Sequence, residues 1–139
     1  MMWVRRTEAM AQIKHIAIRT RDIDKTATFY KDAFGLTQVG MGQNGVYLTD
    51  GHLNIAILKY QQGKDGEPLR LGVDHVGFQV EDLDTAAAHI ESLSGKSLGE
   101  RTEVSPKNAA EPQSYYELKC VGPDEQVIDI SSVGWVGAK

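Results

Sequence analysis

The stretch Ile13-Lys14-His15-Ile16-Ala17-Ile18 decides the fold, because the chain repeats its pattern sixty residues later as Val73-Asp74-His75-Val76-Gly77-Phe78. Both stretches alternate apolar side chains with small or polar ones, which is typical of a half-buried β-strand. The same offset continues beyond both strands and places Asp22 on Asp82, Asp24 on Asp84, Ala27 on Ala87 and Gly35 on Gly95. Self-similarity at a fixed spacing indicates one supersecondary unit used twice.

Each repeat predicts a strand, a helix and then three short strands. Asp22 and Asp82 can cap helices, and apolar residues recur at helical spacing towards Gly35 and Gly95, which suit helix ends. Strands are expected over 13–20, 37–41, 45–49 and 52–59, and, after the second opening strand, over 97–103, 114–120 and 126–131. The polar stretch 61–72 indicates a linker. The stretch 103–114, which holds two prolines, indicates a long loop that could cover a site.

These elements predict an α+β fold made of two βαβββ units. Neither unit can bury its sheet face alone, so the two should associate into one domain over residues 12–133, with repeats at about 12–60 and 72–133. Residues 1–11 are expected to form a flexible extension with Trp3 as its anchoring candidate, and residues 134–139 a C-terminal tail.

Composition excludes several classes of protein. Hydrophobic residues make up 41% of the 139 residues and charged residues 24%, a balance that excludes a disordered chain. The net charge of −4 argues against nucleic acid as a partner, and no apolar run is long enough to predict a membrane span. The single cysteine, Cys120, excludes an intramolecular disulfide, so a reducing, cytoplasmic location is expected.

The strand face turned away from the helices carries the residues with chemistry. His15 and His75 occupy equivalent places in the two repeats, and Asp129 lies on the same face of a later strand. Two histidines and one carboxylate suit Fe(II), Mn(II), Zn(II), Ni(II) or Co(II). The alternative is a buried His–Asp pair that only specifies the core. Because the two histidines are duplicated, we favour one divalent ion over this alternative.

At this point the sequence resembles the vicinal oxygen chelate superfamily, which includes glyoxalases, bleomycin- and fosfomycin-resistance proteins, methylmalonyl-CoA epimerases and extradiol dioxygenases. The resemblance covers about residues 12–133 and rests on the order of the segments IKHIAI, FYKDAFGL, VDHVGFQV and GPDEQVIDIS. It implies a mixed sheet of paired βαβββ units around a half-open barrel cleft, metal ligands at His15, His75 and Asp129, a small-molecule substrate and a homodimer.

Three departures from the family pattern bear on function. The last ligand is usually Glu, whereas Asp129 is one methylene shorter. Ala56 occupies the place of the fourth ligand of glyoxalase-like members, and neither Asn54 nor His52 fits that register. The acid–base His and Tyr of extradiol-type members have no counterparts, and Lys119 stands at the Tyr position.

Other residues are candidates for roles around the predicted ion. Glu117 and Lys119 could line the cleft as a general base and an anion-binding group, although a solvated strand edge also explains them. The expected substrate cleft adds the six residues Ala17, Asn54, Ala56, Gly77, Tyr47 and Tyr115, of which Ala17 and Gly77 leave space beside the histidines. Trp135 could cover the cleft or a dimer contact.

The sequence therefore predicts a metal-dependent enzyme that acts on a small substrate with vicinal oxygens. An extradiol-type dioxygenase, with Fe(II) or Mn(II), fits the three-ligand set. A glyoxalase-like lyase or isomerase is the alternative within the same class. A second alternative is a metal-free protein that sequesters a drug in the cleft.

Overall fold

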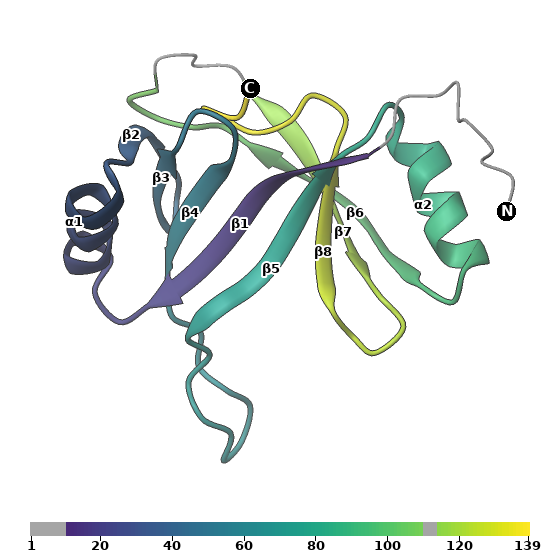
Figure 1. Ribbon diagram of the computed structural model, residues 1–139. Helices are drawn as coiled ribbons and strands as arrows, with labels where there is room; N and C mark the ends of the chain where they lie inside the picture. Colours follow the sequence, from purple (N-terminus) through teal and green to yellow (C-terminus); the bar gives the residue numbers. More distant parts are fainter. Residues whose placement is uncertain (1–10, 110–113) are drawn as a thin grey trace, which may run out of the picture.

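The computed structural model describes residues 11–109 and 114–139 (Figure 1). Its first repeat contains β1 (Gln12–Thr20), α1 (Ile23–Phe34), β2 (Thr37–Met41), β3 (Gly45–Thr49) and β4 (Asn54–Lys59). The second contains β5 (Gly72–Gln79), α2 (Leu83–Ser92), β6 (Lys96–Val104), β7 (Tyr115–Val121) and β8 (Val127–Ser131). Trp3, the anchoring candidate of the expected N-terminal extension, lies outside the described residues.

All eight strands join one curled sheet in the order β2-β3-β4-β1-β5-β8-β7-β6. This order is symmetric about the β1–β5 pair, which is antiparallel, while β1 pairs with β4 and β5 with β8 in parallel. The two helices lie near opposite ends of the sheet, α1 beside β2 and β3 and α2 towards the β6 end (Figure 1). The predicted α+β fold of two βαβββ repeats around a half-open barrel is confirmed.

Local sequence explains where the helices begin and end. Asp22 accepts a hydrogen bond from the backbone of Lys25, and Asp82 accepts one from Thr85 in the same way. Gly35 ends α1 with a left-handed φ of 70°, as predicted. The second helix differs, because it ends at Ser92 and the positive φ of 72° falls on Ser94 rather than on Gly95. Gly95 is needed instead for space, since a Cβ there would lie 2.5 Å from Ile90.

The apolar core is divided between the two repeats. Ala27 of α1 packs with Val46, Leu48 and Ile57 of β3 and β4. In the second repeat Leu83 of α2 packs with Leu118, Cys120 and Ile130. Each helix therefore covers its own strands, and the opposite face of the sheet is left for polar side chains near the β1–β5 seam.

Two chain segments join parts of the fold that are distant in sequence. Lys107, in the loop after β6, exchanges two backbone hydrogen bonds of 2.8 Å with Met41 at the end of β2. Residues 134–139, which we expected to be a tail, pack against the sheet, with Trp135 and Val136 buried. No helix in the part of the chain described by the structure is long and apolar enough to cross a bilayer.

Candidate metal centre

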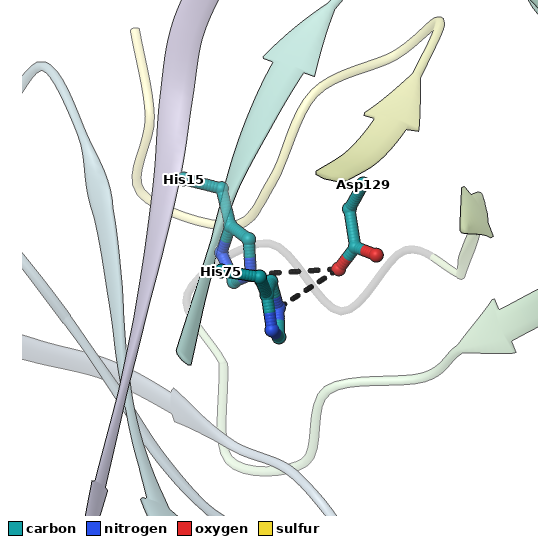
Figure 2. Close-up of side chains that lie close together, drawn as sticks. All are labelled: His15, His75 and Asp129. Carbon is teal, nitrogen blue, oxygen red and sulfur yellow. Dashed lines mark hydrogen bonds and ion pairs between the residues drawn. The ribbon is translucent and has the colours of Figure 1, made fainter. Parts of the chain in front are cut away.

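Three buried side chains from three strands converge on the inner face of the sheet. His15 comes from β1, His75 from β5 and Asp129 from β8, and their polar ends point towards one another (Figure 2). His15 Nε2 lies 3.2 Å from His75 Nε2, and Asp129 Oδ2 lies 2.9 Å from His75 Nε2 and 3.9 Å from His15 Nε2. The β1–β5 register places each histidine beside a small residue of the other strand, His15 opposite Gly77 and His75 opposite Ala17.

The outer nitrogen of each histidine contacts a fixed oxygen. His15 Nδ1 lies 2.7 Å from Asn54 Oδ1, and the Asn54 amide in turn donates to the carbonyl of Val136 at 2.8 Å. His75 Nδ1 lies 2.7 Å from Asp74 Oδ2. Metal-binding histidines are held in this way by groups behind them, which orient the ring and leave Nε2 for the ion.

The contact between Asp74 and His75 depends on a β-bulge. Ala17 pairs with His75 and Ile18 with Val73, so Asp74 is an extra residue in β5 with no partner in β1. A bulge lets two adjacent side chains turn towards the same side, which a regular strand forbids. Arg19 and Arg70 hold the other oxygen of Asp74, at 3.2 and 3.1 Å.

The donor set fits a divalent ion. Asp129 is 1% exposed, and its Oδ2 faces His75 Nε2 at 2.9 Å and His15 Nε2 at 3.9 Å. Ligand atoms that share one ion at about 2.1 Å lie roughly 3.0–3.4 Å apart. The separations observed here bracket that range, so His15, His75 and Asp129 could hold a metal ion.

The two histidines differ in their electrostatic surroundings. Burial, aided by the neighbouring His75 and opposed by the hydrogen bond to Asn54, lowers the pKa of His15 to about 4. Burial also acts to lower the pKa of His75, but its contacts with Asp129 and Asp74 outweigh burial and raise it. Although burial disfavours the Asp129 carboxylate, His75 and Lys119 lower the pKa of this group. The centre therefore holds neutral His15 beside an anionic carboxylate.

Two further titratable groups approach the centre from β7. Lys119 Nζ donates to Asp129 Oδ1 at 2.6 Å, and its side chain is 44% exposed. Glu117 accepts a hydrogen bond of 2.7 Å from the indole of Trp135. Burial, together with the charge of Asp129, raises the pKa of Glu117 to about 7 against that hydrogen bond.

A cavity of about 430 Å³ opens beside these groups. Its lining includes His15, His75, Asp129, Glu117 and Lys119, together with Tyr47 and Ala56 from the first repeat. The other four expected cleft residues, Ala17, Asn54, Gly77 and Tyr115, do not line it. Asn54 lies behind His15, and Gly77 lies under the indole of Trp135, which fills the space that we expected to be open to substrate.

Sequence reasoning missed the residues behind the histidines. Asp74 carries no functional signal in the sequence beyond its place in the repeat, because strand alternation puts it on the opposite face from His75. Arg70 lies only four residues before Asp74 but in the expected linker, and Arg19 lies in the other repeat, so no sequence pattern connects either arginine with His75. Asn54 was expected in the cleft rather than behind a ligand, and no pattern pointed to its contact with Val136.

Comparison with known proteins agrees with this geometry. The sequence profile of the Glyoxalase/Bleomycin resistance protein/Dioxygenase superfamily matches residues 12–109, and the chain belongs to this superfamily. Its relatives include the uncharacterized protein YaeR of Escherichia coli, 27% identical over 96 residues, which are 60% of this chain and 71% of YaeR. The glutathione transferase FosA of Serratia marcescens is 25% identical over 130 residues, which are 94% of this chain and 86% of FosA.

Solved structures share the fold at lower identity. A Mn(II)-bound glyoxalase from Novosphingobium aromaticivorans superposes with a TM-score of 0.64 at 22% identity, covering 91% of this chain and 40% of that one. The 2,3-dioxygenase LapB from Pseudomonas sp. KL28 gives a TM-score of 0.63 at 18% identity, covering 91% of this chain and 42% of LapB. These relatives differ in the reactions that their names state, so the reaction of this chain has to be argued from its own site.

Proposed function

We propose that the chain is a divalent-metal-dependent enzyme that binds a small substrate through two neighbouring oxygen atoms, with His15, His75 and Asp129 as metal ligands. The observation that carries the proposal is the convergence of three buried ligand atoms, from three different strands, within 4.8 Å of one another.

The donor set favours Fe(II) or Mn(II), and Zn(II), Ni(II) or Co(II) would also accept two imidazoles and a carboxylate. A bound divalent ion supplies Lewis-acid polarisation of a substrate oxygen. The chain's own residues then determine how a substrate lies in the cavity and where its protons move.

An extradiol-type dioxygenase is the first form of the proposal. Two histidines and one carboxylate are the ligand set of non-haem Fe(II) oxygenases, and the dioxygenase LapB shares the fold. In this form Lys119, whose ammonium group lies at the cavity wall beside Asp129, would hold an anionic oxygen of the substrate.

A glyoxalase-like lyase or isomerase is the second form, and Glu117 favours it. This carboxyl group lines the cavity, and its pKa of about 7 lies where a general base works best near neutral pH. The indole of Trp135 holds Oε1 in place, which leaves Oε2 to exchange a proton with a bound substrate.

Two parallel assays on one preparation distinguish these forms. Protein loaded anaerobically with Fe(II) is given a panel of catechols and then oxygen, and oxygen uptake and yellow ring-cleavage products are recorded. Protein loaded with Ni(II) or Zn(II) is given hemithioacetals. The Asp129→Asn variant should lose the activity, whereas Asp84→Asn, which removes an exposed ion pair with Arg101, should keep it.

Metal analysis tests whether the chain binds a divalent ion through the proposed ligands. Untagged protein should bind one divalent ion per chain, and His15→Ala/His75→Ala should bind none with comparable affinity. Full-strength binding by the double variant would refute the ligand assignment. Tight binding of an organic ligand to metal-free protein, with no activity in either assay, would instead support a sequestering protein.

A further inference from the structure

We propose that Asn54 and Asp74 are the positioning residues of the metal centre, because they fix the proton of each histidine on Nδ1 and thereby leave both Nε2 lone pairs facing Asp129. This inference rests on the proposed ligand set and deepens it. Neither residue lines the cavity, and neither is one of the three proposed metal ligands.

The orientation of the Asn54 amide determines the tautomer of His15. A backbone carbonyl accepts only, so the group that faces Val136 O at 2.8 Å must be the NH₂ of Asn54. The amide oxygen therefore faces His15 Nδ1 at 2.7 Å, and that nitrogen must carry the hydrogen. In the neutral ring, Nε2 then holds the lone pair.

The C-terminal segment also contributes to the tautomer of His15, because it holds the carbonyl that orients Asn54. Val136 is held in place by its neighbours, since Gly137 O accepts a hydrogen bond from Thr49 at 2.9 Å and Trp135 stacks on the His15 ring itself. Asn54 is fully buried, so no water competes for its amide. The position of residues 135–137 therefore helps to determine which nitrogen of His15 carries the lone pair, because it orients the Asn54 amide.

Asp74 determines the tautomer of His75 through its carboxylate. Asp74 Oδ2, 2.7 Å from Nδ1, and Asp129 Oδ2, 2.9 Å from Nε2, are both acceptors and compete for the single proton of neutral His75, and we assign that proton to the shorter contact with Asp74. Asp74 Oδ1 is occupied by the side chains of Arg19 and Arg70, which are donors only. These two arginines require an acceptor at this oxygen, whatever residue supplies it.

That requirement predicts an unusual effect of an isosteric change. In Asp74→Asn the amide oxygen should turn towards Arg19 and Arg70, which leaves the NH₂ group facing His75 Nδ1. An NH₂ group donates, so the hydrogen of neutral His75 must move to Nε2. The variant should then present an N–H towards Asp129 where the wild type presents a lone pair, with the ring in the same place.

The test reads the tautomers directly in metal-free protein. Long-range ¹H–¹⁵N correlation spectra are recorded over a range of alkaline pH, and the tautomers are read where both rings have lost their second proton, since the pKa of His75 is raised. We expect the Nδ1–H form for both rings in the wild type and the Nε2–H form for His75 in Asp74→Asn. Asp84→Asn, the same substitution in an exposed ion pair with Arg101, serves as the matched control and should leave both tautomers unchanged.

Affinity for Zn(II) and Mn(II), measured by competition with a chelating dye, gives the second readout. Asp74→Asn and Asn54→Leu should weaken binding by about 10- to 100-fold, the range found when groups behind metal ligands are removed. The thermal unfolding midpoint of each variant separates this effect from misfolding, and Asp74→Asn keeps the inference testable if Asn54→Leu does not fold.

The outcomes separate the inference from the proposed function. An Nδ1–H tautomer of His75 that persists in Asp74→Asn, or an Nε2–H tautomer of either ring in the wild type, would overturn the inference even if metal binds. Absence of metal binding by wild-type protein would refute the proposed function, while the tautomers in metal-free protein would still decide the roles of Asn54 and Asp74.

Discussion

The indole of Trp135 lies flat against the imidazole of His15, with ring centroids 4.8 Å apart and planes inclined by 7°. The same indole donates its N–H to Glu117 and covers Gly77. One side chain near the end of the chain therefore contacts a metal-ligand candidate of the first repeat and a carboxylate and a glycine of the second.

Replacing Trp135 should separate its packing from its hydrogen bond. Trp135→Ala leaves a cavity beside His15 and should lower the free energy of unfolding by about 3–5 kcal/mol. Trp135→Phe keeps a ring there and loses the N–H, so a loss of about 1 kcal/mol is expected. Urea unfolding of both variants measures this. Tyr116→Ala, which removes a half-exposed aromatic ring, is the control, and an equal effect of Trp135→Ala would contradict the buried role.

Gly77→Ala should be destabilising because the added Cβ would lie 2.7 Å from Trp135 Cη2 and 2.8 Å from His15 Cβ. We expect a loss of about 1–3 kcal/mol, as for other overpacked sites. Combining it with Trp135→Phe removes Cη2 and should recover part of the loss, which a double-mutant cycle in urea detects. Strictly additive effects would show that the indole does not limit the space at Gly77.

Lys119→Met should strengthen divalent metal binding. The ammonium group lies 2.6 Å from Asp129 Oδ1, so it repels a cation held by the same carboxylate. Its removal should tighten Zn(II) or Mn(II) binding by about tenfold and increase the dependence of that affinity on pH, since Asp129 loses a partner that lowers its pKa. Lys107→Met, which removes another lysine of the cavity lining, should change the affinity much less. Weaker binding by Lys119→Met would indicate that the lysine supports the site.

Glu117 should make metal-free protein less stable as the pH rises. Burial raises its pKa from 4.5 to about 7, so the folded state holds a proton that the unfolded state has lost between these values. The resulting stabilisation is complete below pH 4.5 and disappears as the pH rises through about 7. Glu117→Gln cannot ionise, so the difference between its thermal unfolding midpoint and that of the wild type should increase from pH 4.5 to about 8. The exposed Glu67→Gln should show no such trend, and a constant difference for Glu117→Gln would contradict the raised pKa.

Much of the fold could be predicted because its signals are local and duplicated. The alternation around His15 and His75, the caps at Asp22 and Asp82 and the stop at Gly35 each depend on a few neighbouring residues. Gly95 misled the prediction because a glycine can serve close packing as well as a helix end. The side-by-side placement of His15 and His75 followed from the repeat itself, since equivalent residues of two related units meet near their shared axis.

The rest of the candidate site depends on contacts that no period describes. Asp74 reaches His75 through a bulge, Asn54 is oriented by the carbonyl of Val136, and Trp135 fills the space beside Gly77. Each of these contacts joins segments whose spacing carries no pattern, or breaks the alternation of a strand. The homodimer stays a prediction, and Trp135, which we considered as a dimer contact, is buried within its own chain.

Because the core is divided into two apolar clusters, an ion held by the three candidate ligands would connect the two repeats. His15 belongs to one repeat, His75 and Asp129 belong to the other, and β1 and β5 meet between them. An ion bound there would be coordinated by both repeats and would therefore oppose their separation. Ligand binding restricted to the folded state contributes about 2.7 kcal/mol at a ligand concentration one hundred times the dissociation constant. The unfolding temperature would then serve as a gauge of metal supply.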